Sequence, residues 1–480
     1  MGYTITQKPN QLAGANNPMM FIVKETDGAI TGGFKFRYII QVYISTTDAT
    51  TWVEKSKIKI HKNSASVGIV DIHKIVRTYL DTQEASQIEN PAGTFTVQTG
   101  ANASIHAVGV KDTARPFSSN TSQLIGVKLV GGYEVASSAT AAPTETLAAA
   151  NTIIYSIPAA TPFTNTGTNV GGLDEDGENN PMTNFIPSSN SKKFLTNAPT
   201  VQFVRGGDDT ADNVDLATVG FIQDGSSVLI TDGDPIVRIY VQYHQADGTS
   251  IGSYHFINEL AGGGIDVADD VRNSLLYFGC GTANLETQAD NTGARPSEND
   301  GWAYYRVWGA NGDNSEQETA YYYFYKYGTN ASVDDRHQSC TRHNNVRLAW
   351  RNRLGAWDYM NFRGKSVENV DIKGSEMESV PGTWNTATFT YENWDRGKRT
   401  LYKTATRKLS VNSDWLNEDE AVWLEELFTS INVQIIGSDD KIYPVIITNK
   451  KYTKKTSLNN KIKIQYKIEL DYANTIKTNS

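Results

Sequence analysis

The sequence predicts a mainly β protein: several antiparallel β-sandwich domains of immunoglobulin-like type, a few short helices and a C-terminal α+β domain. Three observations support this: apolar residues alternate with polar ones, turn residues separate β-rich runs, and few stretches have helical spacing. A chain of 480 residues is too long for one core, so we expect three domains. They are 1–195, with a loop-rich insertion from about 90 to 195, then 196–345, and finally 346–480.

The alternation is clearest near the two ends of the chain. Apolar side chains occupy every second position from Phe34 to Ile44, which places them on one face of a strand. From Ile462 to Tyr472 apolar and polar residues again alternate. At roughly 3.3 Å per residue, residues 461–472 predict a strand on the order of 40 Å long. Strands of that length often extend between subunits.

Turn residues predict three hairpins. Asp247-Gly248 lies between two β-rich runs and favours a tight turn with positive φ. Residues 302–327 contain two runs dense in Tyr and Trp around a polar loop. Residues 347–366, RLAWRNRLGAWDYMNFRGKS, predict a third hairpin, which turns where Gly355 adopts a left-handed conformation. Together these hairpins indicate sandwich architecture.

Two short helices are expected, each lying on a sheet. The first takes Asp71 as its N-cap. Its apolar face comprises Ile72, Ile75, Val76 and Tyr79. The second begins at Asn417, where Glu420 completes a capping-box spacing. Its apolar face comprises Leu424, Leu427, Phe428 and Ile431.

Charge and cysteine content restrict the function classes. The net charge of −9 argues against a general basic field for free nucleic acid, so we expect no direct sequence-specific binding of nucleic acid. Residues 411–440 carry eight acidic and no basic side chains, whereas residues 441–480 carry nine lysines. This asymmetry fits either separate solvated faces or a charge-matched contact between copies. Two cysteines, no secretion signal and no apolar run of about 18 residues predict folding in a reducing cytoplasm, away from membranes.

Catalytic and metal-binding patterns are weak, and we expect neither an enzyme nor a cofactor. His337, Cys340 and His343 are spaced by three, but a fourth ligand is missing and the segment lies between predicted hairpins, which favours a loop. The acidic turn at 174–178 resembles the start of a calcium loop without its later Glu. Cys280 has no nearby base and fits a packing role.

Aromatic and basic side chains leave alternatives open. The tyrosines and tryptophans between Tyr304 and Tyr327 would suit a platform for sugar rings, although residues at consecutive positions point to both faces, so at least half pack inward. Arg351 and Arg353 lie near the turn of the third hairpin. They would pair with acidic groups of a neighbour, point into a DNA-bearing channel, or remain solvated.

The segments WRNRLGAWDYMNF, SDWLNEDEAVWLEELFTSINVQII and YPVIITNKKYTKKTSLNNKIKIQYKIELDYAN resemble a group of virion structural proteins of tailed bacteriophages. The N-terminal segments NNPMMFIVKE, FKFRYIIQVYI and VGIVDIHKIVRTYL resemble the opening domain of such proteins. The similarity covers about the first 80 residues and residues 270–475, and it is a similarity of pattern rather than of a chemical motif.

The resemblance implies a tail, neck or baseplate component, assembled in the bacterial cytoplasm and present in the virion as several symmetric copies. Its partners would be other copies of itself and other tail proteins, and a DNA channel would lie inside such a ring. The packing candidates are Trp350, Trp357, Tyr359, Trp415 and Trp423. The candidates for charge pairing between subunits are Glu418, Glu420 and Glu425 on the helix, with Lys454, Lys455 and Lys463 on the segment 450–467. Two other functions remain open: a receptor- or glycan-binding tail protein, and a glycan-degrading β-sandwich enzyme.

Overall fold

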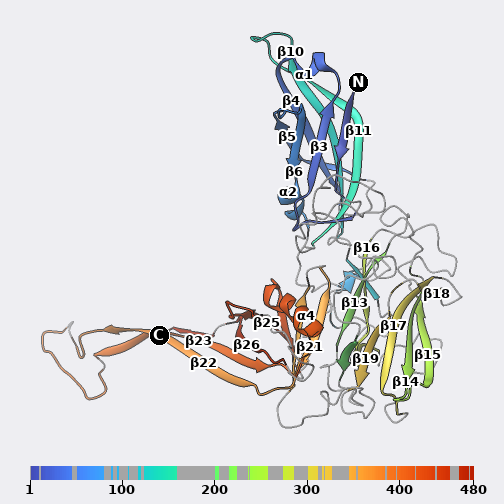
Figure 1. Ribbon diagram of the computed structural model, residues 1–480. Helices are drawn as coiled ribbons and strands as arrows, with labels where there is room; N and C mark the ends of the chain where they lie inside the picture. Colours follow the sequence, from blue (N-terminus) through green and yellow to red (C-terminus); the bar gives the residue numbers. More distant parts are fainter. Residues whose placement is uncertain are drawn as a thin grey trace. The chain divides into compact units, whose positions relative to one another are not determined.

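The computed structural model confirms the predicted class: the chain is mainly β, with several antiparallel sheets and short helices (Figure 1). It describes residues 2–9, 12–45, 51–80, 88–89, 95–96, 106, 117–120, 124–158, 201–204, 216–223, 236, 238–257, 274–285, 301–311, 316–317, 319, 321–326, 345–352, 355–383, 386–395, 397–416, 418–437, 441–453, 464–474 and 476–479. The chain divides into two compact units, 1–333 with 351–358, and 334–350 with 359–480. The three predicted domains stay a prediction.

Two sheets form the N-terminal part of the first unit. One has the order β1 (Tyr3–Gln7), β3 (Met20–Glu25), β6 (Val67–Asp71). The other has the order β2 (Leu12–Gly14), β11 (Thr144–Ile157), β10 (Ile125–Ala136), β4 (Phe34–Ser45), β5 (Val53–Ile60). All neighbours are antiparallel except β2 and β11, which run parallel. The helices here are α1 (Gly28–Thr31) and α2 (His73–Arg77).

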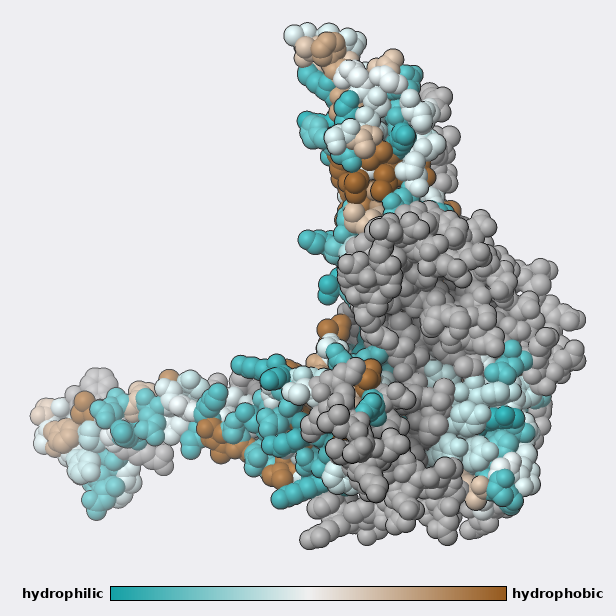
Figure 2. All heavy atoms as spheres, viewed as in Figure 1, coloured by the Kyte–Doolittle hydropathy of each residue, from teal (hydrophilic) through white to brown (hydrophobic). Residues whose placement is uncertain are grey.

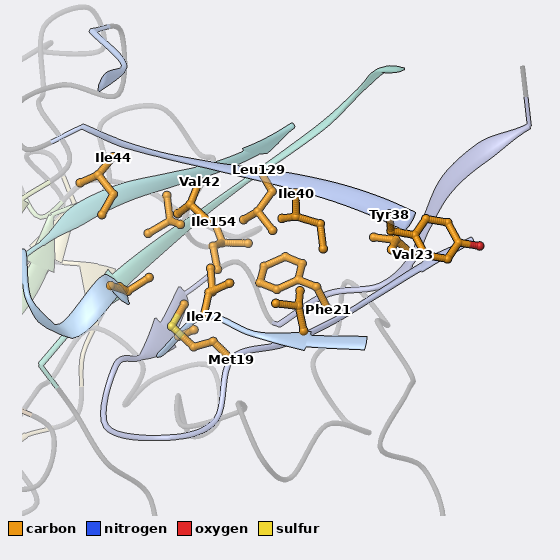
Figure 3. Close-up of a cluster of buried hydrophobic side chains, with 14 of the residues drawn as sticks. Met19, Phe21, Val23, Tyr38, Ile40, Val42, Ile44, Ile72, Leu129 and Ile154 are labelled. Carbon is orange, nitrogen blue, oxygen red and sulfur yellow. The ribbon is translucent and has the colours of Figure 1, made fainter. Parts of the chain in front are cut away.

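A shared apolar core holds these two sheets together (Figure 3). Phe21 of β3 points toward Ile40 of β4, Leu129 of β10 and Ile154 of β11, and all four are at most 1% exposed. The predicted apolar face of residues 34–44 is buried from Phe36 onward, but the prediction is wrong for Phe34, which is 55% exposed at the strand end. Consecutive residues in the middle of β4 are buried, so both faces of the strand are covered there.

Helix α2 differs in detail from its prediction. Its N-cap is Ile72, and no side chain caps it. Asp71 Oδ1 still accepts the backbone N–H groups of His73 at 3.1 Å and of Met19 at 3.0 Å. The carboxylate therefore joins the helix start to the chain that enters β3. Ile72 and Val76 are fully buried, as the spacing predicts.

The middle of the chain forms two further sheets of the first unit. The larger has the order β12 (Val201–Val204), β19 (Tyr322–Lys326), β17 (Tyr304–Asn311), β14 (Arg238–His244), β15 (Ser250–Ile257), with β18 (Glu316–Gln317) beside β17. The smaller has the order β13 (Thr218–Gln223), β16 (Ser274–Gly279), β9 (Phe117–Asn120). The short pair β7 (Ile88–Glu89) and β8 (Phe95–Thr96) and helix α3 (Thr282–Leu285) complete this part.

Contacts between these two sheets indicate sandwich packing. The ring of Phe256 on β15 lies 5.4 Å from that of Phe278 on β16. Tyr305 Oη donates to the carbonyl oxygen of Cys280 at 2.8 Å. The hairpin predicted at Asp247-Gly248 is confirmed as β14–β15, where Gly248 has a φ of 88°.

The second unit is built on one sheet of eight strands. Its order is β21 (Trp357–Phe362), β20 (Val346–Arg351), β24 (Val433–Ile436), β25 (Ile442–Ile447), β26 (Lys467–Tyr472), β23 (Lys398–Asn412), β22 (Val367–Glu378), with β27 (Ile476–Asn479) also paired to β23. Residues 351–358 of the β20–β21 hairpin belong to the first unit. Helix α4 (Glu418–Thr429) confirms the predicted α+β character.

The predicted long C-terminal strand is shorter than expected. Strand β26 contains only residues 467–472, and Ile464 makes one isolated bridge to Leu416. The side chain and the backbone of Ser413 occupy the N–H and C=O groups of Tyr466, at 2.9 and 2.8 Å, which interrupts the regular ladder there. Burial nevertheless alternates with period two from Ile464 to Leu470. The long strands of this unit are instead β22 and β23.

Candidate assembly surface

The most distinctive surface of the second unit is formed by strands β22 and β23, and we call it the arm. It comprises β22, β23 up to Ser410, and the connecting tip, residues 379–397. The strands pair antiparallel from Val367↔Ser410 to Glu378↔Lys398, with one irregularity near Ser375. Strands β27 and β26 pair with the other edge of β23 at residues 402–405 and 408–412. Strand β22 is the last strand of the sheet and is exposed along almost all of its length. The arm therefore projects from its sheet with a free edge (Figure 1).

Exposed apolar side chains concentrate in the second unit. Of the eighteen large hydrophobic residues that are exposed in the described chain, fourteen lie between residues 367 and 446. Figure 2 shows hydrophobic side chains at the surface of the arm, interspersed with hydrophilic ones. Those on the arm are Val367, Val370, Ile372, Met377, Val380, Phe389, Tyr391, Trp394, Leu401 and Tyr402. Soluble monomers rarely gather so many apolar side chains on one element, and such patches mark interaction sites.

The two arm strands carry opposite charge. Strand β22 has four acidic side chains and Lys373, whereas β23 has five basic side chains and no acidic one. Lys408 Nζ lies 2.7 Å from Asp371 Oδ2, and this contact lowers the pKa of Asp371 and raises that of Lys408. Because these pairs are exposed, each stabilises the ribbon only slightly.

The tip of the arm is held by its own hydrogen bonds. Ser379 N–H donates to the Gly397 carbonyl at 2.7 Å, and Thr383 N–H donates to the Thr390 carbonyl at 3.0 Å. Gly382 has a φ of 84°, a conformation that favours glycine, and an added Cβ would meet the Thr390 carbonyl oxygen. This hydrogen-bonded scaffold presents the aromatic rings of Phe389, Tyr391 and Trp394 to solvent.

Helix α4 has one buried face and one exposed stripe. The buried face contains Ala421, Leu424 and Leu427, which confirms the predicted apolar side at the two leucines. Ile431, which the spacing also placed there, lies beyond the helix end and is 77% exposed. The exposed stripe, which we call the α4 stripe, comprises Glu418, Val422, Glu425 and Thr429.

Four of the five aromatic packing candidates are buried inside the chain. Trp350 and Trp423 lie with ring centroids 4.9 Å apart, and they join β20 to α4. Trp357 contacts the ring of His106 edge-on at 4.6 Å. Tyr359 is 3% exposed. Trp415 differs, since it is 41% exposed immediately before α4.

The basic candidates of the β20–β21 hairpin have different positions. Arg351 is 5% exposed and lies close enough to Tyr277 to influence that hydroxyl, whose pKa burial raises to about 12. The alternative that Arg351 remains solvated is therefore wrong. Arg353 lies outside the described residues. Sequence inspection missed Arg347, which is 2% exposed and donates to Asn361 Oδ1 at 3.1 Å.

The lysine-rich segment expected to meet α4 of a neighbour contacts α4 of its own chain. Tyr452 Oη donates to the Ala421 carbonyl, and the Tyr452 ring lies 4.9 Å from Phe428. Burial and a hydrogen bond with Tyr466 raise the pKa of Tyr452. Lys454, Lys455 and Lys463 lie outside the described residues. Glu420 is half-buried, whereas Glu418 and Glu425 are exposed.

The aromatic face considered for sugar binding is a stack of rings across three strands. The ring of Tyr304 on β17 lies parallel to that of His244 on β14, at 4.8 Å and 7°, and to that of Tyr325 on β19, at 4.9 Å and 18°. Arg306 lies over the rings of Trp308 and Tyr321. A sugar stacks on a free ring face, and here neighbours already occupy both faces of Tyr304.

His, Cys, Asp and Glu are the usual protein ligands of a metal ion, and many of them lie among the residues that the structure describes. No group of three or more His, Cys, Asp or Glu side chains among them is arranged to hold a metal ion. His337, Cys340, His343 and the acidic turn at 174–178 lie outside these residues. Cys280 is buried and forms no disulfide with a described residue. Within the described part of the chain, no helix combines the length and apolarity needed to cross a membrane.

Comparison with known proteins gives no relative that defines a family. No family model matches the chain, and no curated protein matches it. Among solved structures, crystal structures of a mutant and of a methylamine-reacted Salmonella alpha-2-macroglobulin align with 8% identity and TM-scores of 0.16 and 0.17. The alignments cover 99% of this chain and 31% of those chains, so the chain spans less than a third of their length. Scores this low carry no argument about fold or function.

Proposed function

We propose that the protein is a structural subunit of a symmetric assembly, and specifically of the tail, neck or baseplate of a bacteriophage virion. The exposed apolar arm is the observation that carries the proposal. A ribbon with ten exposed large apolar side chains loses stability in water unless another surface covers it. The assignment to a phage virion rests in addition on the resemblance of residues 270–475 to virion proteins of tailed bacteriophages.

Charge and burial in the second unit support the same proposal. The aromatic candidates of β20 and α4 pack within the chain, so they support the sheet from which the arm projects rather than a ligand site. The surface that remains available combines apolar side chains with segregated charge. That combination is typical of contacts between proteins, in which apolar groups supply affinity and charge sets orientation.

The test is the state of association of the purified full chain. We expect sedimentation velocity to reveal species larger than a monomer as concentration rises, and negative-stain images to reveal closed rings or regular filaments. A chain that remains monomeric at every concentration up to the limit of solubility contradicts the proposal. Antibodies against the protein should also label tails, necks or baseplates of purified virions, and labelling of no virion part would contradict the phage assignment.

A second test concerns the lysines that the sequence singled out. Replacement of Lys454, Lys455 and Lys463 with Glu is expected to weaken assembly while the far-ultraviolet circular dichroism stays unchanged. Unaltered assembly would remove these three lysines from the interface without touching the proposal itself. The control is Lys24→Glu with Lys74→Glu, which reverses two charges at exposed positions of the first unit.

A glycan-binding tail protein is the second candidate. The cluster of aromatic rings on β14, β17 and β19 favours it, whereas the mutual stacking of those rings argues against it. A glycan array with the purified chain distinguishes the two functions. Binding that Tyr323→Ala abolishes would support the glycan function.

A further inference from the structure

We infer that the arm of one copy docks on the α4 stripe of a second copy, in a head-to-tail contact between two different surfaces of the second unit. This inference rests on the proposed function and deepens it, because it names the two surfaces that meet. It commits to a second copy as the partner because the two surfaces of one sequence match each other in charge and in apolar content.

The docking face of the arm follows from its register. Residues directly opposite in an antiparallel pair share a face. Ile372 is opposite Ala405, and Arg407 and Lys403 lie two positions to either side of Ala405 on the same strand. Val370 is opposite Arg407. One face of the arm therefore presents Val370 and Ile372, 51% and 66% exposed, beside Arg407 and Lys403. Glu368 lies on the same face, with its Oε1 atom 3.9 Å from Arg407 Nε, so docking on an acidic surface has to compete with this exposed ion pair.

The α4 stripe has the complementary pattern. Val422 is 42% exposed and lies between Glu418 and Glu425, both also exposed on the same side of the helix. The helix as a whole contains five acidic residues and no basic one. Two exposed apolar residues flank it, Trp415 before its start and Ile431 after its end.

The spacing of the charges agrees on the two surfaces. Glu418 and Glu425 are seven residues apart in a helix, a rise of about 10 Å. Lys403 and Arg407 are four residues apart in a strand, a span of about 13 Å. The flexible lysine and arginine side chains absorb the difference of a few ångströms. Two ion pairs can therefore form together while Val422 packs against Val370 and Ile372.

Charge disfavours the alternative contact, in which the arms of two copies pair with each other. Two arms that paired through their free β22 edges would bring together two strands that each carry four acidic side chains and one lysine. Like charges placed opposite each other destabilise such a pair. The contact between an arm and an α4 stripe instead joins a basic strand to an acidic helix. Because the two surfaces differ, each copy uses both and the contact generates a ring or a filament.

The area of the inferred contact is smaller than that of a typical stable interface. One face of a twelve-residue ribbon measures roughly 40 Å by 10 Å, or about 400 Å². A stable interface typically buries about 800 Å² on each partner. A single arm contact is therefore weak. In a ring, each copy makes two such contacts, and these stabilise the ring together with contacts of the aromatic tip.

The experiment uses two charge-reversed forms of the full chain. The arm variant is Lys403→Glu with Arg407→Glu, and the helix variant is Glu418→Lys with Glu425→Lys. Each alone places like charges across the contact, so we expect its apparent association constant to fall by about tenfold or more. Mixed in equal amounts, the two variants restore opposite charges at every contact. Association should then return with the variants alternating, as cross-linking and mass spectrometry would detect.

Controls separate the possible outcomes. Lys24→Glu with Lys74→Glu changes the same charge elsewhere and should leave association intact. If the wild-type chain never associates, the proposed function fails together with this inference. If it associates but both variants behave like wild type, or the mixture does not recover, this inference alone is overturned. If either variant associates as strongly as the wild-type chain without its partner variant, the inference is also overturned.

A second measurement covers the case in which a variant does not fold. Ile372→Cys and Val422→Cys, in separate copies that are mixed and oxidised, should form a disulfide between chains. Val53→Cys replaces Ile372→Cys in the control, since Val53 is an exposed strand residue of the first unit. Equal cross-linking by the control pair would contradict the assigned surfaces.

Discussion

Trp350 of strand β20 and Trp423 of helix α4 pack with their ring centroids 4.9 Å apart and their planes inclined by 44°. Trp350 is fully buried and Trp423 is 8% exposed. The pair joins the helix to the sheet that carries the arm, so the position of the α4 stripe depends on it. Aromatic pairs of this geometry contribute stability beyond their buried area.

Loss of either ring should destabilise the second unit. Trp350→Ala is expected to lower the free energy of unfolding by about 3–5 kcal/mol, because it leaves a large cavity beneath α4. Urea denaturation followed by circular dichroism measures the change. Trp415→Ala is the matched control, since that ring is 41% exposed and its removal leaves a smaller void. Equal effects of the two substitutions would argue against the role of the buried pair.

Stability should depend on pH through Glu145 of β11. Hydrogen bonds from Lys57 and Lys59 lower the pKa of this carboxyl below its ordinary value of 4.5. A group whose folded pKa is depressed stabilises the fold above its unfolded pKa and loses that effect as pH falls through the folded pKa. The difference in urea midpoint between wild type and Glu145→Gln should therefore be present at neutral pH and shrink under acid conditions. A difference that stays constant down to the acid limit would refute this linkage, and Glu378→Gln on the arm serves as the reference substitution.

The turn of the β20–β21 hairpin should tolerate only glycine at position 355. Gly355 has a φ of 94°, and an added Cβ would lie 3.3 Å from the carbonyl oxygen of Pro158. Gly355→Ala is expected to cost about 1–2 kcal/mol of stability, because L residues are strained in this conformation. Thermal unfolding measures it. Gly28→Ala at the start of α1 is the control, because a Cβ there meets no atom within 4 Å. No difference between the two substitutions would contradict the strain.

The stacked rings of the β14–β17–β19 sheet should contribute to stability rather than to sugar binding. Tyr304→Ala removes three ring contacts, with His244, Tyr323 and Tyr325, and should cost about 1–3 kcal/mol. Denaturation measures the cost, and a glycan array on the wild-type chain should give no signal above background. The comparison substitution is Ser253→Ala on β15, which removes no ring. Strong glycan binding by the wild-type chain would contradict this prediction.

The stable parts of the fold were predictable because local rules decide them. Alternating apolar residues identified β4, and Asp247-Gly248 between two β-rich runs identified the β14–β15 hairpin, since side-chain period and backbone sterics act over a few residues. The buried face of α4 followed from helical spacing. The candidate site was predictable only in part: the acidic helix and the aromatic packing residues were identified, and the arm was not.

The arm escaped prediction because its strands alternate poorly. In VENVDIKGSEME the apolar residues fall on both faces, so periodicity assigns neither face to a core. A charged strand of this kind is indistinguishable, in sequence, from the edge strand of a closed sandwich. In the structure, β23 pairs with β26 and β27 on one side and with β22 on the other. The exposure of almost every β22 residue shows that no described segment covers this strand.

The sequence by itself determined the class of fold, the Asp247-Gly248 turn and four of the five aromatic side chains that were expected to pack. The tertiary structure alone decided where packing stops: β26 ends early beside Ser413, Phe34 and Ile431 remain exposed, and Arg351 is buried. The physical reason is that backbone preference acts between near neighbours, whereas burial depends on segments far apart in the chain. The exposure of Ile372 and Val422, on which the inferred contact depends, belongs to the second kind.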